Sequence, residues 1–543
     1  MVAPLLGRHH TNIGRWFRAY AITGIKGEKM VAYIVRRLGV LGVILFGSSF
    51  ILYNMAAIAG DPIGELRLSN DPAAKQAIID LTLRLQLDVP PPLRYFIWLK
   101  GVLGVFVGNP DFGLTRDNMS VYSEISQAIP VTIRLVTTAT IVAIVLGIAL
   151  GVTSALRQYT RFDYSMTFFA FLLYSLPIFW VAVLLKQFLA IRFNDFLSHS
   201  TVHRNSILLL SLLSAIFWGS IFGRARKTFW ITFTSAALGT ASLLMFMNVL
   251  EWYTNPRLGP ITVFILSVGI AFGVTHLSVG LSNRTALYSS LTMAGLALVI
   301  YFPIQSLFTA QSTFLQMLLL LVVTIAVATG VSFMFSRIDR GPLIRTTILT
   351  AFLSASLIII DKYMRTWQLY MQEDAINNRP IPTIGQVSDL LPQDNYWIRT
   401  LDILVHLFLP TIALTLISFA GYTRFSRGTL LEVLNQDYIR TARAKGLTER
   451  TVIMRHAFRN TLIPLTTIIV VDFAGIIGGA IITERVFGWY GMGTLFNRAI
   501  TGQDLNLLMG VFFLTASLSV LANLIADLLY SALDPRIRVG AGK

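Results

Sequence analysis

The sequence predicts an all-α protein that crosses a membrane many times, and three observations lead to this fold class. Of the 543 residues, 55% are hydrophobic and only 13% are charged, with a mean hydropathy of +0.66. Such a composition is too apolar for a soluble globule. The apolar residues lie in continuous runs, and a helix needs roughly 20 of them to cross a hydrocarbon core of about 30 Å. Runs of this kind also exclude a closed β-barrel, whose residues alternate between lipid and lumen.

Twelve apolar runs are predicted to be membrane spans. They lie near 38–58, 131–155, 166–190, 206–222, 229–249, 260–281, 286–306, 314–335, 345–361, 403–423, 463–483 and 507–530. Two long segments between them, 60–130 and 362–402, are more polar and contain prolines. They are predicted to be folded caps, docking surfaces for an external partner or plain connecting loops.

The orientation of the spans is predicted from the basic residues in the short loops. The N-terminal segment and the loops 157–164, 224–228 and 336–345 are basic, and all of them fall on one side of the membrane. Because cytoplasmic loops carry an excess of Lys and Arg, we expect the N- and C-termini to be cytoplasmic. This asymmetry accounts for the formal net charge of +17 without a nucleic-acid partner. Residues 1–30 lack the pattern of a removable signal peptide, which favours a retained first span.

The segment 438–464 is the most informative part of the chain. It reads YIRTARAKGLTERTVIMRHAFRNTLIP, and it is basic, favours a helix and lies between two apolar runs. Its small residues Ala442, Ala444 and Gly446 would let another protein approach closely, and its basic side chains could pair with acidic residues there. The alternative is an amphipathic helix that lies on anionic lipid. Taken alone, the segment therefore predicts a cytoplasmic helix that docks either on a protein or on the membrane surface.

This segment resembles the cytoplasmic EAA loop of ABC importer permeases, in the form found in the dipeptide/oligopeptide/nickel branch of the binding-protein-dependent transport inner-membrane components. Members of that branch read like EDYVRTARAKGL and RHALRNALIP, where this chain has QDYIRTARAKGL (436–447) and RHAFRNTLIP (455–464). Four further motifs are similar, namely GDP (60–62), SLPIFW (175–180), ERVFGWYGMG (484–493) and DLLYSALDPRIR (527–538). Tyr490 stands where the family usually has proline.

The resemblance implies a type I ABC importer permease core of about six spans, interrupted here by an inserted bundle of about six spans. The implied domains are the N-terminus with the first transmembrane helix (1–60), an extracytoplasmic segment (61–127), a permease core in two parts (128–193 and 396–535), the insert (194–395) and a cytoplasmic coupling loop (425–464). Because six is even, the insert leaves the coupling loop on the cytoplasmic side. The insert could pack around the core, recruit a partner, guard the substrate path or merely stabilise the bundle.

By the same resemblance, the chain is the permease subunit of an ATP-driven importer of di- or oligopeptides in a bacterial cytoplasmic membrane. The implied partners are a second homologous permease, two ATPase subunits and an extracytoplasmic solute-binding protein, together with membrane lipid. The chain has no GxxxxGK[ST] phosphate loop, so it is not expected to hydrolyse ATP, and ATP and Mg would sit on the partner subunits. It also has no HExxH or other tight metal-ligand cluster and no nucleophile elbow, so it is not expected to be an enzyme or to hold a cofactor or metal. The residues implied in ATPase coupling are Tyr438, Arg440, Thr441, Ala442, Ala444, Lys445, Gly446 and Leu447.

Three residues are candidates for the translocation path. Pro177 falls inside a predicted span, where proline removes a backbone hydrogen bond and kinks the helix, and Trp180 belongs to the same motif. Asp472 lies inside the run 463–483, where a carboxylate usually faces a bundle interior or water. It either lines the path, where it could meet a cationic substrate group, or pairs with a neighbouring helix.

Two other functions stay open at this point, a twelve-span secondary transporter and a transporter-like membrane scaffold or sensor. The substrate is open as well, since nickel, glutathione and opines are alternatives to peptides.

Overall fold

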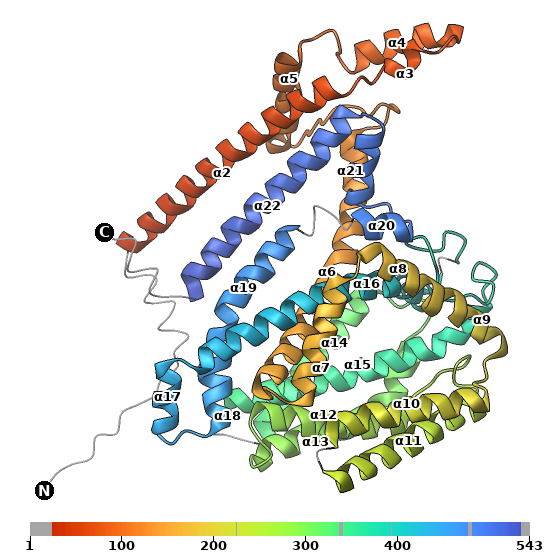
Figure 1. Ribbon diagram of the computed structural model, residues 1–543, viewed down its shortest axis with the longest axis vertical. Helices are drawn as coiled ribbons and strands as arrows, with labels where there is room; N and C mark the ends of the chain where they lie inside the picture. Colours follow the sequence, from red (N-terminus) through yellow and green to blue (C-terminus); the bar gives the residue numbers. More distant parts are fainter. Residues whose placement is uncertain (1–23, 224, 336–339, 393, 476–480, 534–543) are drawn as a thin grey trace, which may run out of the picture. The chain divides into compact units, whose positions relative to one another are not determined.

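The computed structural model describes residues 24–223, 225–335, 340–392, 394–475 and 481–533 (Figure 1). Within these residues the regular structure is helical, and a single isolated β-bridge joins Leu114 and Ser120. Ten of the described helices are long and apolar enough to cross a membrane, and one bent pair of helices can be counted as a further span. The predicted class, an all-α polytopic membrane protein, is confirmed.

The helices follow one another along the chain in three stretches. The first contains α2 (Gly24–Ala59), α3 (Gly64–Arg67), α4 (Pro72–Arg84), α5 (Pro91–Leu103), η1 (Gly104–Val107), α6 (Val121–Leu156), α7 (Arg161–Ser175), α8 (Ile178–Leu185), η2 (Lys186–Ile191) and α9 (Arg192–His199). The second contains α10 (Arg204–Phe222), α11 (Arg226–Val249), α12 (Gly259–Ser278), α13 (Arg284–Leu307), α14 (Phe314–Phe335) and α15 (Arg340–Gln372). The third contains α16 (Tyr396–Leu434), α17 (Asp437–Ala444), α18 (Glu449–Thr451), η3 (Val452–Ala457), α19 (Phe458–Gly475), α20 (Ile481–Phe487), α21 (Met492–Thr501) and α22 (Leu505–Leu533).

The third predicted run, 166–190, is not one straight helix. α7 ends at Ser175, Leu176 is extended, Pro177 precedes α8, and the two helical parts are bent by 101°. The residue before a proline is forced out of the helical region by the proline ring, so the break follows directly from the sequence Leu-Pro. The eleventh run, 463–483, begins in α19 and includes residues 476–480, which lie outside the described residues.

The described residues form two compact units. The first takes its residues from 1–140, 428–484 and 490–543, and the second from 141–427 and 485–489. The long helices α6 and α16 each contribute to both units. The predicted coupling loop after residue 427 belongs to the first unit, whereas the predicted insert belongs to the second.

The core of the first unit is an aromatic cluster between α2, α5 and α22. The rings of Tyr53 and Tyr95 are fully buried and lie 5.5 Å apart between centroids, and the ring of Trp98 lies 5.8 Å from that of Phe513. The Tyr95 hydroxyl shares a 2.8 Å hydrogen bond with Ser49. Aromatic pairs of this geometry add to the stabilisation from burial alone, so the cluster anchors the α5 region to the ends of two long helices.

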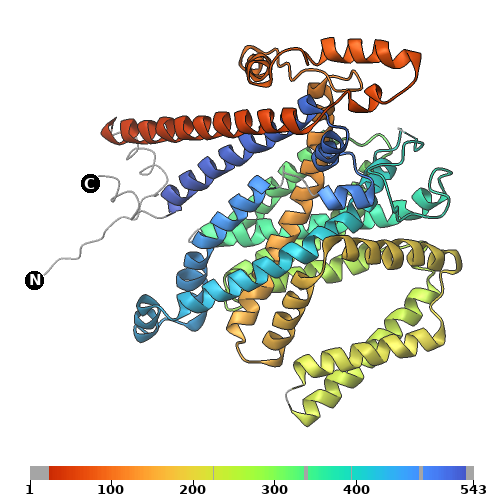
Figure 2. The ribbon, with the colours of Figure 1, turned by 45° about the horizontal axis from the view of Figure 1, so that its top comes forward.

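In the second unit, all six apolar runs predicted within 194–395 are helices of membrane-crossing length, α10 to α15. α12, α13, α14 and α15 pack against one another, and α10 and α11 form a hairpin whose helices lie side by side in both views (Figure 2). α11 has no buried residue. The side of α11 that does not contact α10 is therefore open to lipid or to another protein.

A buried carboxylate joins three helices of this bundle. Asp361 on α15 accepts hydrogen bonds from the backbone N–H groups of Leu258 and Gly259, at 2.7 and 3.0 Å, and from the hydroxyl of Tyr301 on α13. Arg365, one turn further along α15, donates to it at 2.8 Å. Because Gly259 begins α12, the negative charge also faces the positive end of that helix. The bundle is thus held in register by a specific polar contact as well as by packing.

Candidate coupling segment and transport path

The predicted coupling residues lie on α17 and on the turn that follows it. Asp437 in the first turn and Arg443 in the last turn suit the helix dipole, negative at the start and positive at the end. The side chains of Ile439 and Ala442 are buried, and α17 packs against η3. A short helix with so few charges in its favour would be marginal alone, so the contact with η3 holds it in place.

Gly446 ends this helix. Its φ of +75° lies in the left-handed region, which glycine adopts without steric cost. The backbone N–H of Gly446 donates to the carbonyl of Arg443 at 2.9 Å, and that of Lys445 to Thr441 at 3.0 Å. Gly446 therefore allows the turn that ends α17. It also lacks a side chain, so it would let another protein approach the backbone closely.

Of the eight predicted coupling residues, seven have exposed side chains or, for glycine, an exposed backbone. They are Tyr438, Arg440, Thr441, Ala444, Lys445, Gly446 and Leu447. Ala442 is the exception, because it is only 6% exposed and packs inward. The small size of Ala442 therefore serves the packing of α17, and its part in ATPase coupling stays a prediction.

Ion pairs within the segment leave some of its basic residues occupied. Arg443 donates to both carboxylate oxygens of Glu449, at 2.6 and 3.2 Å, and Arg440 lies 3.5 Å from Asp437. The hydrogen bond between Arg443 and Glu449 raises the pKa of the arginine and lowers the pKa of the glutamate. The exposed Lys445 has no carboxylate within ion-pair distance among the described residues. Within α17 and the turn that follows it, Lys445 is thus the basic residue left without an ion pair, and it is available to an acidic partner.

A second polar contact, absent from the sequence predictions, lies in the second unit. Asp163 at the start of α7 is buried and forms a two-pronged ion pair with Arg427 on α16, at 2.8 and 3.0 Å. It also accepts hydrogen bonds from the hydroxyl of Ser154 on α6, at 2.5 Å, and from the N–H of Tyr159, at 3.1 Å. The contact fastens α6, α7 and α16 together, and we name it the Asp163–Arg427 clamp.

The translocation-path candidates fall in different units. Pro177 and the half-exposed Trp180 lie in the second unit, at the break between α7 and α8 and on the first turn of α8. Asp472 lies on α19 in the first unit, and its side chain is exposed. The role of all three in transport stays a prediction.

Comparison with known proteins identifies the relatives of this chain. Residues 143–539 match the model of the family described as "Binding-protein-dependent transport system inner membrane component". The chain belongs to this family. The matched range contains the break at Pro177, the Asp163–Arg427 clamp and the α17 segment.

Individual relatives are peptide permeases by name. The chain is 38% identical over 188 residues to the oligopeptide transport system permease protein OppB of Mycobacterium tuberculosis, which is 35% of this chain and 55% of OppB. It is 44% identical over 138 residues to the dipeptide transport system permease protein DppB of Escherichia coli K12, covering 25% and 41%. DppB of Alkalihalophilus pseudofirmus aligns over 511 residues at 25% identity, covering 94% of this chain and all of that protein. The chain spans about half the length of OppB and less of the Escherichia coli DppB.

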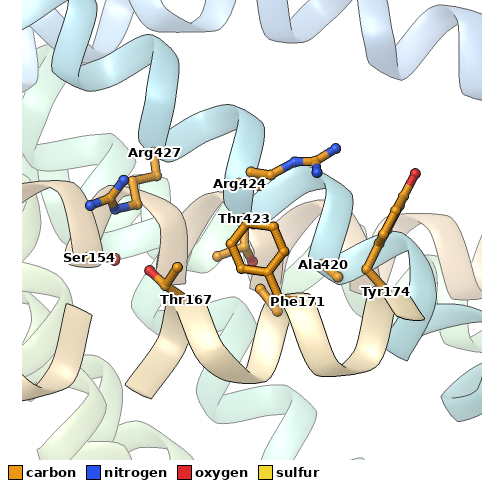
Figure 3. Close-up of a pocket in the computed structure, with 9 residues that line it drawn as sticks. Ser154, Thr167, Phe171, Tyr174, Ala420, Thr423, Arg424 and Arg427 are labelled. Atoms are coloured by element: carbon orange, nitrogen blue, oxygen red, sulfur yellow. The ribbon is translucent and has the colours of Figure 1, made fainter. Parts of the chain in front are cut away.

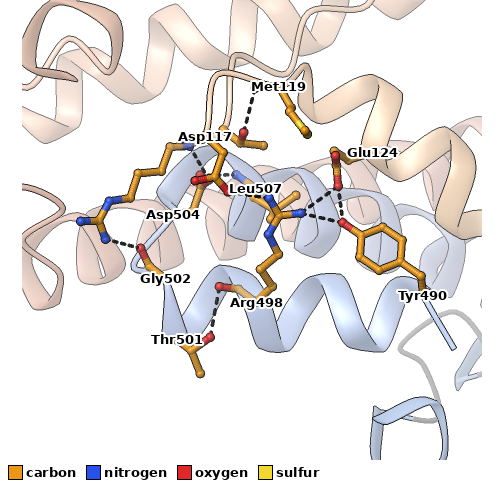
Figure 4. A network of polar contacts seen from close by, with 11 residues as sticks. Asp117, Met119, Glu124, Tyr490, Arg498, Thr501, Gly502, Asp504 and Leu507 are labelled. Atoms are coloured by element: carbon orange, nitrogen blue, oxygen red, sulfur yellow. Dashed lines mark hydrogen bonds and ion pairs between the residues drawn. The ribbon is translucent and has the colours of Figure 1, made fainter. Parts of the chain in front are cut away.

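This family member carries an ion-pair network at the predicted extracytoplasmic side of the first unit (Figure 4). Arg498 on α21 donates to Asp117 at 2.6 Å, to Glu124 at the start of α6 at 3.0 Å and to the Tyr490 hydroxyl at 2.6 Å. The contact with Asp117 is the main reason that the pKa of Arg498 is raised, and burial raises the pKa of Tyr490. Tyr490, where the family usually has proline, thus contributes a hydroxyl to the network.

Neighbouring residues extend the same arrangement. The backbone N–H of Arg116 donates to Asp504 at 2.7 Å, and its guanidinium donates to the carbonyl of Gly502 at 3.2 Å. Glu484, in the matched motif 484–493, is fully buried and accepts from the Thr132 hydroxyl at 2.7 Å and from the N–H of Thr494 at 2.9 Å. Burial raises the pKa of this carboxyl.

Replacing Arg498 by glutamine is expected to loosen this region. The change removes the positive charge that pairs with two carboxylates. Because these ion pairs are partly exposed, we expect the free energy of unfolding to fall by about 1–2 kcal/mol. The thermal midpoint of the purified protein, followed by tryptophan fluorescence, should fall. Arg485→Gln, which changes an exposed arginine of α20, should leave the midpoint unchanged. An equal effect of the two variants would show that the network does not stabilise the fold.

The sequence predictions missed the clamp and the Arg498 network for the same reason. Asp163 with Arg427, and Asp117 with Arg498, are separated by hundreds of residues. Only the opposite charges near predicted span ends could have pointed to the clamp, and such charges more often face water or lipid head groups.

Proposed function

We propose that the chain is the membrane-spanning permease subunit of an ATP-driven importer of di- or oligopeptides. The observation that carries this proposal is the exposed α17 segment, which is held by its own contacts with η3 yet presents Ala444, Lys445 and Leu447 outward in a chain of this family. The names of the relatives, oligopeptide and dipeptide permeases, support peptides as the substrate class.

In this proposal the chain works within a larger complex. A second homologous permease completes the path, an extracytoplasmic solute-binding protein delivers the peptide, and two ATPase subunits bind ATP and Mg. The chain would contribute no ATPase site of its own. The α17 segment would transmit the movement of an ATPase subunit, which requires a rigid element with a discrete contact rather than a deformable one. The N- and C-termini and α17 would face the cytoplasm of a bacterial inner membrane.

The domain organisation fits the same proposal. Residues 128–193 and 396–535 would form the permease core, 61–127 an extracytoplasmic segment and 194–395 an added bundle, with 425–464 as the coupling loop. The second unit supports the close association of the added bundle with core residues, since it contains 141–193 and 396–427 together with the six inserted helices.

The proposal is tested by purifying the tagged chain from its native membrane and by measuring peptide uptake. We expect ATPase subunits and a second permease to co-purify, and uptake of a labelled tripeptide to stop when the ATPase genes are deleted. Uptake that survives this deletion but collapses with the proton gradient would instead indicate a secondary transporter. A complex with no ATPase subunit and no transport would indicate a scaffold or sensor.

Pro177→Ala is expected to impair uptake strongly without reducing the amount of protein in the membrane. Proline in the interior of a helix costs about 3 kcal/mol, so removing it favours a continuous α7–α8 helix over the observed break. The measurement is peptide uptake per amount of inserted chain. Pro303→Ala is the matched control, because Pro303 lies inside α13 where the helix continues, and it should retain uptake. Full uptake by the Pro177 variant would exclude a role for the break in transport.

A further inference from the structure

A cavity in the second unit lies between α6, α7 and α16 (Figure 3). Its volume is about 110 Å³, and its wall combines the apolar side chains of Ala170, Phe171 and Ala420 with polar groups of Ser154, Thr167, Thr423, Tyr174, Arg424 and Arg427. Whole ligands usually occupy cavities of about 300–1,000 Å³. This cavity is therefore large enough for one end of a ligand but not for a complete peptide.

Two polar groups of this wall are unsatisfied in the described part of the chain. The hydroxyl of Thr423 is buried and has no hydrogen-bond partner there. The guanidinium of Arg424 lies 5.0 Å from the ring centre of Tyr174, and no carboxylate of the described residues is within ion-pair distance of it. Arg427, by contrast, is neutralised by Asp163. The cavity wall thus has one spare buried hydroxyl and, on an exposed side chain at its rim, one positive charge without an ion pair.

Arg424 stands directly after the predicted span 403–423, and its side chain is exposed. It lies one turn before Arg427, whose partner Asp163 is at the start of α7. Its guanidinium reaches the ring of Tyr174, eleven residues further along α7. Three residues after Tyr174 the helix breaks at Pro177, and non-helical backbone at membrane depth occurs where it is buried in protein or lines a water-filled cavity. The break therefore favours an aqueous path over lipid beside the exposed guanidinium.

We propose that Arg424 and Thr423 bind the C-terminal carboxylate of the transported peptide. This inference rests on the proposed function and names the part of the substrate that the site takes. The planar guanidinium can donate two parallel hydrogen bonds to a carboxylate, and the Thr423 hydroxyl can donate a third. Tyr174 holds the guanidinium in place through its ring. The C-terminal carboxylate is an anion common to all linear peptides, so one fixed arginine would serve substrates of differing sequence.

The test compares uptake of trialanine with that of trialaninamide, which lacks the carboxylate, in the assembled complex with its own binding protein. The readout is the acid-to-amide ratio of kcat/KM, because any preference of the binding protein is the same for every permease variant. Arg424→Gln is expected to lower this ratio about 10- to 100-fold, the factor that corresponds to a charge-assisted hydrogen bond. Arg157→Gln is the matched control, since Arg157 is an exposed arginine beside the Phe162 ring but outside the cavity, and it should keep the wild-type ratio.

Thr423→Val separates binding from folding. It replaces an unsatisfied buried hydroxyl by a methyl group of the same shape, so the chain should fold at least as stably, yet the ratio should fall about 3- to 10-fold, the factor of a neutral hydrogen bond. Wild-type ratios in both the Arg424→Gln and the Thr423→Val complexes would overturn the inference and leave the proposed function standing. Absence of uptake of either peptide by the wild-type complex would overturn the proposed function and this inference with it.

Discussion

Ala444→Glu is expected to abolish ATP-driven uptake while the chain still folds and inserts. Ala444 is the last residue of α17, and its side chain is exposed, so the fold of the chain does not depend on it. The introduced carboxylate would lie one turn from Arg440, a spacing that an isolated helix tolerates. At the centre of a protein contact, however, a buried charge and the added bulk cost about 2–4 kcal/mol or more of binding.

The experiment measures two quantities for this variant, uptake of a labelled tripeptide and the amount of ATPase subunit that co-purifies with the chain. Both should fall, whereas the thermal midpoint and the amount in the membrane should match the wild type. Ala73→Glu is the matched control, because Ala73 is also exposed on a helix but lies on α4, and it should retain uptake. Gly446 is a poorer choice, since its positive φ makes any side chain a source of backbone strain. Normal uptake by the Ala444 variant would contradict the docking role of α17.

Arg427→Ala is expected to cause the largest loss of stability of any single change considered for this chain. Asp163 is 2% exposed, and without the guanidinium it would be left as a buried carboxylate with only the Ser154 hydroxyl and the Tyr159 N–H as partners. Removal of one member of a buried ion pair costs about 3–5 kcal/mol. Because the Arg427 side chain is 28% exposed, water can partly replace it, and we expect a loss near the lower end of this range.

The measurement is the thermal midpoint of the detergent-solubilised protein, followed by tryptophan fluorescence, which suits a chain with nine tryptophans and no cysteine. The double change Asp163→Leu with Arg427→Met should recover much of the loss, since apolar groups of similar volume can replace a buried pair. A double variant as unstable as Arg427→Ala would mean that the charge left behind is not the cause.

Much of the topology could be predicted from apolar run lengths alone. All six runs of the insert are helices, and the runs near 38–58, 131–155, 403–423 and 507–530 lie within α2, α6, α16 and α22. Local chemistry was informative as well, because the Leu-Pro pair at 176–177 marks the position at which α7 ends. The size of that bend, 101°, could not be predicted, since it depends on what the following helix packs against.

The coupling segment, too, could be predicted in part from the sequence. The small and basic pattern of 438–447 was enough to locate α17, and it made Ala442 look like part of the outer surface. Whether a small side chain on a short helix faces a partner or its own protein depends on the element that packs against the helix, here η3. The residue pattern of α17 by itself does not show which of its faces contacts η3.

The sequence alone therefore determined that this protein is a multi-span helical membrane protein and pointed to its family, since hydrophobic length, loop charge and short motifs are local properties of the chain. Only the tertiary structure decided which charged side chains form ion pairs within the protein and which remain unpaired and available to a ligand. Arg424 and Arg427 are three residues apart and chemically identical, yet one is paired with a buried carboxylate and the other lines a cavity beside Tyr174. That difference arises from the packing of α6 and α7 against α16, because the partner of a charge is set by which helices are neighbours in space.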